Sequence, residues 1–277
     1  MVSGWQWDRS LFRGSAAYYD QGRLPYAADW VQALAAVLDL DGHGRALDVG
    51  CGPGTVTLPL SNHFDEVVGV DPDDEMLAEG DRRATERGIS NIRWVAARAE
   101  ELPADLGAFS VASFAQSFHW LDRDKVAATI FDLLDAGGAF VHVSDRKDVP
   151  PTRPARMPAP PYPGMANLVR RYLGPERRAG QGVIRNGTPN REDLVLERAG
   201  FVDHRRLTVP AGGEVERTAD DIVAWVFSRS DSAPHLFGER LGDFEQDLRA
   251  LLRETSVDGS FAELLPDTEI MTWRKPG

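Results

Sequence analysis

Three glycines lie close together in residues 46–55, where Gly50, Gly52 and Gly54 follow a run of strand-forming residues. Glycine lets a backbone turn sharply and approach a ligand without a clash from a Cβ atom. The helix expected after this loop would present free N–H groups to a polar or anionic ligand. The pattern therefore predicts a loop that binds a nucleotide-type cofactor.

A carboxylate accompanies this loop, because Asp71 stands 21 residues after Gly50, at the expected end of the next strand. At that edge of a parallel sheet, a carboxylate can accept hydrogen bonds from both hydroxyls of a ribose. A dinucleotide-binding loop would need a third glycine at position 55, which is Thr55. The spacing therefore disfavours NAD, and an NAD-type oxidoreductase is kept as the alternative from another class of enzyme.

The elements that must position these residues alternate between strand-like and helix-like hydrophobic periods from residue 27 to 145. This alternation is typical of an α/β fold with a doubly wound, parallel sheet. Five strands are expected at residues 45–50, 66–71, 92–96, 109–115 and 139–144. Helices are expected at 30–41, 55–62, 74–87 and 126–134, the third with Asp73 as its N-cap. The later part predicts helices at 166–173, 190–199 with Asn190 as N-cap, 219–227 and 234–255, and strands at 201–209 and 268–275.

The pattern changes after the fifth strand, because seven of the fourteen residues in 150–163 are proline. Proline lacks a backbone donor, so this segment is predicted to form neither a regular helix nor a central strand. Residues 146–178 contain eight basic and two acidic side chains, a local charge of +6 in a chain of net charge -12. Arginine suits carboxylates and phosphates, so a lid over an anionic substrate is one hypothesis, and a solvated loop is the other.

Composition excludes several classes of protein. The 277 residues are 42% hydrophobic and contain one cysteine, Cys51, so an internal disulfide and a Cys-based zinc cage are excluded. No apolar run approaches the ~20 residues of a membrane span, and residues 1–19 do not resemble a signal peptide. A net charge of -12 opposes binding to nucleic acid. We therefore expect a cytoplasmic monomer or homodimer that binds a small molecule, with no metal, nucleic acid or membrane as partner.

The spacing of Asp48 and the three glycines resembles motif I of the class I S-adenosylmethionine-dependent methyltransferases. The resemblance implies a mostly parallel, seven-stranded sheet. It also implies S-adenosylmethionine as cofactor and S-adenosylhomocysteine as product. In that family the glycine loop, which here includes Cys51, packs against the aminoacyl part of the cofactor. The resemblance implies that Asp48 helps to hold the amino group of the cofactor and that Asp71 binds its ribose. It also implies that Pro72 and Met76 lie beside its adenine.

The resemblance extends to the type 11 group, which includes the trans-aconitate methyltransferase-like enzymes. Residues 12–26, with Tyr18 and Arg23, resemble the N-terminal segment that folds over the cofactor in that group. Residues 95–103 resemble the loop after the third strand, where Arg98 occupies the usual acidic position and adenine contact is left to Ala99 or Glu100. Residues 115–120 resemble the Gln-x-x-His-Trp stretch near the methyl donor, which here provides Gln116, Ser117 and His119.

The chain is accordingly expected to be a methyltransferase that acts on a small-molecule metabolite at an oxygen, nitrogen or carbon atom. His119 could serve as the general base or only as a packing residue. A cofactor-binding protein with altered or lost activity is the remaining alternative. The expected parts are a cofactor-covering segment at 1–26, a cofactor-binding core at 27–145, a proline- and arginine-rich lid at 146–200, and strands and helices that complete the sheet at 201–277.

Overall fold

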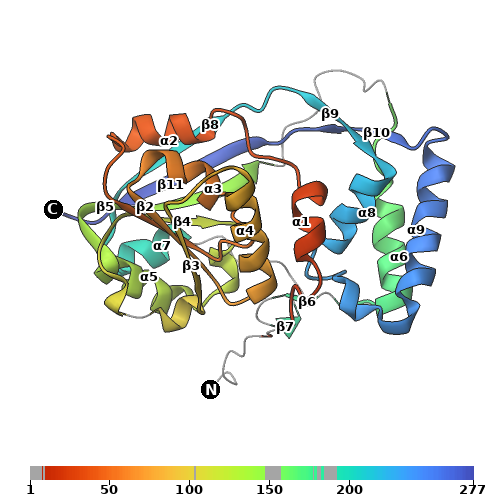
Figure 1. The fold of residues 1–277 in the computed structure, drawn as a ribbon, viewed down its shortest axis with the longest axis horizontal. Helices are drawn as coiled ribbons and strands as arrows, with labels where there is room; N and C mark the ends of the chain where they lie inside the picture. Colours follow the sequence, from red (N-terminus) through yellow and green to blue (C-terminus); the bar gives the residue numbers. More distant parts are fainter. Residues whose placement is uncertain are drawn as a thin grey trace.

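The computed structural model describes residues 8, 10–102, 104–146, 157–176, 178–179, 182–183 and 192–277. A seven-stranded sheet has the strand order β3-β2-β1-β4-β5-β11-β8 (Figure 1). The strands are β1 (Arg45–Val49), β2 (Glu66–Asp71), β3 (Ile92–Ala96), β4 (Phe109–Ala115), β5 (Leu134–Arg146), β8 (Val202–Val209) and β11 (Asp267–Arg274). The first five pair in parallel, whereas β11 runs antiparallel to both β5 and β8. The doubly wound, mostly parallel sheet is therefore confirmed.

Helices cover both faces of the sheet, and its central strands β1, β2 and β4 are accordingly buried on both sides. Leu47 and Val49 of β1 point to the face covered by α5 (Arg123–Leu133) and α7 (Glu192–Arg198). Ala46 points to the opposite face, with α2 (Trp30–Leu38) and α3 (Thr57–Leu60). The helix α4 (Asp74–Glu86) packs on β2 and β3. Short 3-10 helices occupy Ser61–His63, Ala99–Glu101, Ala104–Leu106 and Phe118–Trp120.

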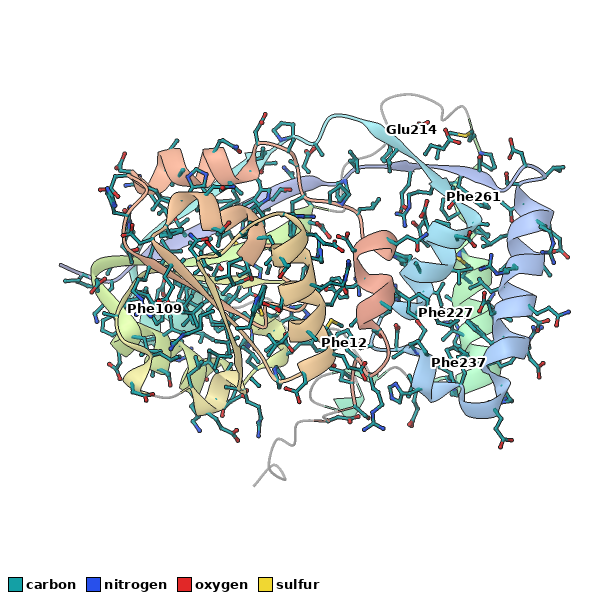
Figure 2. All side chains as sticks on the ribbon, in the orientation of Figure 1. Phe12, Phe109, Glu214, Phe227, Phe237 and Phe261 are labelled. Atoms are coloured by element: carbon teal, nitrogen blue, oxygen red, sulfur yellow. The ribbon has the colours of Figure 1, made fainter. Side chains whose placement is uncertain are left out.

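A second core lies beside the sheet, in a group of elements that we call the helical unit: α6 (Tyr162–Leu173), β9 (Glu214–Thr218), α8 (Ala219–Phe227), α9 (Leu241–Thr255) and β10 (Ser260–Leu264). The strands β9 and β10 pair antiparallel and do not join the large sheet. Figure 2 shows Phe109 on the sheet side and Phe227, Phe237 and Phe261 within the helical unit. Two 3-10 turns, Pro234–Leu236 and Gly238–Arg240, precede α9, and two short strands, Arg178–Ala179 and Gly182–Val183, pair with each other.

The N-terminal helix α1 (Ala16–Gly22) lies between the sheet and the helical unit (Figure 1). It packs closely on α8, because a Cβ atom at Gly22 would be 2.5 Å from the carbonyl carbon and oxygen of Ala224. The buried guanidinium of Arg217 donates a hydrogen bond to the carbonyl oxygen of Gly22 at 2.8 Å. The hydroxyl of Ser15 donates to the carbonyl oxygen of Phe227 at 2.7 Å. These contacts attach α1 to the helical unit.

Several boundaries differ from the sequence predictions. The predicted helix at 55–62 is a single α turn, Thr57–Leu60, followed by a 3-10 turn, and the predicted helix at 234–255 is α-helical only from Leu241. The helix α6 begins at Tyr162, so the exclusion of helix up to residue 163 was wrong. Pro163 lies in the first turn, where the backbone nitrogen needs no partner. The strands β9 and β10 were not predicted, and Asn190 lies outside the described residues.

Among the described residues, no helix combines the length and the apolar character needed to cross a bilayer. The same residues contain no cluster of three or more histidine, cysteine and acidic side chains suited to a metal ion.

Candidate cofactor-binding site

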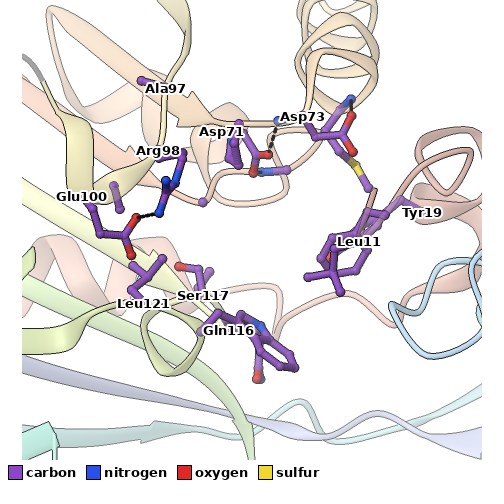
Figure 3. A pocket seen from close by; sticks show the side chains of 18 residues that line it. Leu11, Tyr19, Asp71, Asp73, Ala97, Arg98, Glu100, Gln116, Ser117 and Leu121 are labelled. Atoms are coloured by element: carbon purple, nitrogen blue, oxygen red, sulfur yellow. Dashed lines mark hydrogen bonds and ion pairs between the residues drawn. The ribbon is translucent and has the colours of Figure 1, made fainter. Parts of the chain in front are cut away.

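A cavity that is partly open to solvent lies at the carboxyl ends of β1, β2 and β4. Ligands of open α/β sheets bind at this edge. Figure 3 shows Asp71, Arg98 and Glu100 on one part of the wall, with Leu11 and Tyr19 across from them. The wall consists of Leu11, Phe12, Tyr19, Gly50, Gly52, Asp71, Pro72, Asp73, Met76, Ala97, Arg98, Ala99, Glu100, Ala115, Gln116, Ser117, Trp120 and Leu121.

The glycine loop forms the floor of this cavity. Gly50 and Gly52 have φ angles of 68° and 53°, in the left-handed region that favours glycine. A Cβ atom at Gly50 would be 2.6 Å from the Cβ atom of Ser117, whereas one at Gly52 would meet no atom within 4 Å. The N–H groups of Gly50 and Cys51 both donate to the carbonyl oxygen of Val70, at 2.8 and 3.0 Å. The loop is therefore fixed to β2 and leaves open space above Gly52.

The carboxylate of Asp71 stands at the end of β2, half-buried in the wall. One oxygen accepts a hydrogen bond from the N–H of Gly52 at 2.9 Å, and the other accepts from the N–H of Asp73 at 3.0 Å. Burial raises the pKa of Asp71 to about 7. Each carboxylate oxygen can accept a further bond, so the group can receive two hydroxyls of a ligand when it is ionised.

The first turn of α4 contributes Met76 to the same wall. Asp73 is the N-cap of α4, as predicted, and its carboxylate accepts from the N–H groups of Glu75 at 2.9 Å and Met76 at 3.3 Å. This cap satisfies the free donors of the helix and fixes the chain that follows Asp71. The side chain of Met76 is buried against the cavity, where its flexible thioether can adapt to an apolar ligand surface.

The loop after β3 closes another part of the cavity. The buried carboxylate of Glu100 accepts a hydrogen bond from the N–H of Asp122 at 3.0 Å and forms an ion pair with Arg98 at 3.5 Å. Arg98 also pairs with Glu101 at 3.1 Å. The position that is acidic in the resembled family therefore contains a cation that two carboxylates neutralise. Ala97 and Ala99 provide the apolar surface of this part.

The N-terminal segment covers the cavity opposite this loop. Leu11, Phe12 and Tyr19 line the wall. The N–H of Gly14 donates to the carboxylate of Glu75 on α4 at 2.9 Å. On the next turn of the segment, Asp20 of α1 forms an ion pair with Arg83 of α4, and Arg83 also donates to the carbonyl oxygen of Pro53 at 2.9 Å. The segment is thus attached to α4 and, through Arg83, to the glycine loop.

Five of the fourteen predicted cofactor residues lie outside the wall. Asp48 is buried below the loop, and its carboxylate accepts from the hydroxyls of Thr57 at 2.6 Å and Ser113 at 2.8 Å. Burial raises the pKa of Asp48 to about 6. Cys51 is also buried, and burial raises the pKa of its thiol. Asp48 therefore connects β1 to α3 and β4. The side chain of Cys51 is buried on the side of the loop away from the cavity.

The other three residues support the wall from a distance. Gly54 packs against the indole of Trp94. The ring of Tyr18 lies 5.1 Å from that of Phe227, inside the core of the helical unit. Arg23 stacks over Tyr19 at 4.9 Å and donates to the carbonyl oxygen of Ser228 at 2.7 Å. Tyr18 and Arg23 thus hold the N-terminal segment on the helical unit, while their neighbour Tyr19 faces the cavity.

Gln116 and Ser117 line the wall after β4, close to Gly50. The hydroxyl of Ser117 donates to the carbonyl oxygen of Val49 at 2.6 Å. Gln116 has a φ angle of 56°, unusual for a residue other than glycine, and its carbonyl oxygen accepts from the indole N–H of Trp120 at 3.1 Å. The imidazole of His119 packs 4.5 Å from the ring of Trp120 and does not line the wall.

Half of the wall was absent from the predicted set. Seven of these residues had a signal in the sequence: Asp73 as an N-cap, and the other six because they lie in the segments 12–26, 95–103 and 115–120 that resemble the family. Leu11 and Leu121 had none, because an isolated leucine has the same appearance in any core. The residues outside the predicted set are Leu11, Phe12, Tyr19, Asp73, Ala97, Arg98, Ala115, Trp120 and Leu121.

Comparison with known proteins agrees with this architecture. Residues 46–138 match the family model of the methyltransferase domain. An uncharacterised methyltransferase of Mycobacterium tuberculosis is 30% identical over 193 residues, which are 68% of this chain and 65% of that protein. A ubiquinone/menaquinone biosynthesis C-methyltransferase of Idiomarina loihiensis is 34% identical over 113 residues, 39% of this chain and 45% of that protein. The chain thus spans just under two thirds of the mycobacterial relative.

The fold is shared with a solved structure. The YcgJ protein of Bacillus subtilis has a TM-score of 0.52 at 18% identity, over 89% of this chain and 98% of that one. The sheet order, the glycine loop and the domain match define a class I methyltransferase fold. Residues 46–138 are thus similar to a methyltransferase domain, and the chain shares the fold of these proteins.

Proposed function

We propose that the cavity binds S-adenosylmethionine and that the protein transfers the methyl group to a small molecule. The observation that supports this most is the carboxylate of Asp71, which lies between the N–H groups of Gly52 and Asp73 on the cavity wall. A carboxylate held in this way after the second strand is suited to the two hydroxyls of a ribose. The match of residues 46–138 to a methyltransferase domain favours S-adenosylmethionine over NAD.

The described residues fit this cofactor. A Cβ atom at Gly52 would point into open space, so the backbone of the loop can approach an aminoacyl group directly. Pro72 and Met76 offer an apolar surface beside Asp71, as an adenine ring requires. Leu11 and Tyr19 of the N-terminal segment line the wall across from Asp71. The chemistry that the cofactor supplies when bound is an electrophilic methyl group on a sulfonium sulfur.

The contribution of the chain to catalysis is positioning. Holding an acceptor atom in line with the methyl carbon replaces a bimolecular encounter with a unimolecular step, which can provide about 7–11 kcal/mol. A carboxylate acceptor needs no base, whereas a hydroxyl, amine or carbon acceptor must lose a proton. His119 does not line the wall, so the described arrangement does not place it to take that proton. The proposal therefore assigns the rate enhancement mainly to positioning.

The acceptor in this proposal is an uncharged small molecule with an apolar or aromatic body. Phe12, Tyr19 and Trp120 provide flat apolar surface on the wall. The guanidinium of Arg170 donates to Asn167, and that of Arg171 pairs with Asp247 on α9 at 2.7 Å. Neither arginine lines the cavity. Lys147, Arg153, Arg156 and Arg177 of the basic segment lie outside the described residues, so the anionic acceptor is kept as the competing arm of the test.

Calorimetry tests the cofactor. S-adenosylhomocysteine should bind with a saturable, one-to-one heat, and NAD should give none. Binding of NAD without a response to S-adenosylhomocysteine would refute the proposal.

The acceptor is tested by transfer of a labelled methyl group. The panel should compare phenols and aromatic amines with di- and tricarboxylates. Methylation of the carboxylates alone, with loss of activity in Arg170→Ala and Arg171→Ala, would establish the anionic acceptor instead.

A further inference from the structure

Trp94 is a large aromatic residue in the middle of β3, and it lies outside the cavity wall. In the parallel pairing of β2 and β3, it stands opposite Gly69. Its indole extends from the sheet toward α4 and the glycine loop, and it contacts residues from both. No part of the proposed function has used this side chain.

Three glycines from three different elements surround the six-membered ring of this indole. A Cβ atom at Gly54 of the loop would be 2.7 Å from the Cη2 atom of Trp94. One at Gly80 of α4 would also be 2.7 Å from Cη2, and one at Gly69 of β2 would be 2.9 Å from Cε3 and Cζ3. Such distances are shorter than a carbon–carbon contact permits. Each of the three positions therefore accepts the indole only because it has no side chain.

Two of these glycines occur where glycine is otherwise unfavourable. Gly80 lies inside α4, and Gly69 lies inside β2, and both have ordinary backbone conformations. Glycine in the interior of a helix or strand destabilises that element relative to alanine. The space that the indole occupies gives a reason for glycine at both places. Trp94 and the glycines around it thus form one packing arrangement, which we call the indole slot.

Each element that lines the indole slot also contributes to the cavity. The loop of Gly54 contains Gly52, the strand of Gly69 ends in Asp71, and the helix of Gly80 contains Met76. Cys51 contacts the same arrangement, since its sulfur is 3.2 Å from the Cβ position of Gly69. The rigid indole of Trp94 therefore lies where its size can set the distances between the glycine loop, the carboxylate of Asp71 and α4.

We infer that Trp94 is a positioning residue for the cofactor: it does not touch the ligand, but it holds the glycine loop at the distance from Asp71 and Met76 that binding requires. This inference rests on the proposed function for the identity of the ligand. Interior packing transmits the loss of a side chain into shifts of its neighbours, so a smaller residue at position 94 should release the loop.

The test compares Trp94→Leu with Trp273→Leu, since Trp273 is buried in the sheet and does not line the cavity. Both variants should lower the melting temperature. Only Trp94→Leu should weaken the binding of S-adenosylhomocysteine, by at least about tenfold. Gly80→Ala should also weaken binding, because its methyl group displaces the indole, and adding Gly80→Ala to Trp94→Leu should cause little further loss. Equal affinities for Trp94→Leu and the parent would overturn the inference, and so would additive losses in the double variant.

Hydrogen exchange separates a failure of this inference from a failure of the proposed function. The N–H of Gly54 donates to the carbonyl oxygen of Cys51 at 3.0 Å. Exchange in residues 50–58 should be faster in Trp94→Leu than in Trp273→Leu, whatever the ligand. Unchanged exchange there would overturn the positioning role. A parent protein that binds no S-adenosylhomocysteine, but shows the faster exchange in Trp94→Leu, would refute the proposed function alone.

Discussion

The sheet and the helical unit are built in different ways. At the edge of the sheet that lines the cavity, residues close together in sequence meet: Gly52, Asp71 and Asp73 are joined by two hydrogen bonds across a span of 21 residues. In the helical unit, the core joins segments from both ends of the chain. Its contacts to α1 connect Ser15 with Phe227 and Gly22 with Arg217, about 200 residues apart.

The two regions also contribute different chemistry to the cavity. The end of β2 and the segments after β1, β3 and β4 supply its polar groups, including Asp71, Glu100 and Gln116. The N-terminal segment, which the helical unit holds in place, supplies Leu11, Phe12 and Tyr19. Recognition of the cofactor thus depends on local turns and caps at the sheet edge, whereas the cover over it depends on long-range packing. Substitutions at the sheet edge should therefore lower affinity more than stability, and substitutions that disturb the helical unit should lower stability more than affinity.

The largest effect on affinity is expected for Gly50→Ala. Its φ of 68° strains any side chain, and the new Cβ atom would be 2.6 Å from that of Ser117. Affinity for S-adenosylhomocysteine should fall by about a hundredfold or more, because the clash with Ser117 must displace the loop that lines the cavity. Gly88→Ala is the matched control, because Gly88 has a φ of 67° with no atom near its Cβ position. Calorimetry should show parent-like affinity for the control, and equal losses in both variants would contradict the account.

Asp71→Asn should have the next largest effect. It preserves the shape of the side chain but removes the charged acceptor, and affinity should fall by about ten- to a hundredfold. Asp65→Asn is a suitable control, because Asp65 also accepts a backbone hydrogen bond, from Gly44 at 2.8 Å, on the exposed surface. Affinity of the control should equal that of the parent.

The pH dependence of binding tests whether the charge of the Asp71 carboxylate contributes to affinity. The pKa of Asp71 is about 7, so the carboxylate is ionised above that pH and protonated below it. If the ionised form accepts the ribose hydroxyls, affinity should fall by about tenfold from pH 8 to pH 6. Asp71→Asn should abolish this dependence. A flat profile in the parent protein would show that the charge of Asp71 does not contribute to binding.

A change at the contact between α1 and the helical unit should lower stability more than affinity. Gly22→Ala would push a methyl group into the backbone of Ala224, and overpacking of this kind costs about 1–3 kcal/mol of stability. Hydrogen exchange in α1 and α8 should increase, while affinity should change far less than in Gly50→Ala. Gly242→Ala on α9 is the control, because no atom lies within 4 Å of its Cβ position. Unchanged protection of α1 and α8 would contradict the assignment of their contact.

The smallest effect is expected for His119→Ala. Its imidazole does not line the cavity, so kcat should stay within about threefold of the parent, far from the 10²–10⁴-fold that general acid–base catalysis contributes. Single-turnover rates with an accepted substrate would measure this. A loss of a hundredfold or more would assign His119 as the general base and show that the site rearranges when ligands bind.

The sequence predictions were more successful where short local patterns determine the structure than where distant segments pack together. The five parallel strands, the N-cap Asp73 and the cavity position of Asp71 follow from short patterns, because turns, caps and alternating apolar residues act over a few positions. The strands β9 and β10 were missed, since residues such as Glu214 and Glu216 give no apolar alternation and the pairing depends on a partner 46 residues away. The roles of Asp48 and Tyr18 could not be derived either, because burial depends on which distant residues pack against them.

The most direct test is a crystal structure of the protein with S-adenosylhomocysteine. The account predicts the ligand in the cavity at the carboxyl ends of β1, β2 and β4, with both ribose hydroxyls within hydrogen-bond distance of Asp71 and the amino-acid part over Gly50 and Gly52. A ligand bound elsewhere, or a ribose beyond hydrogen-bond distance of Asp71, would contradict it.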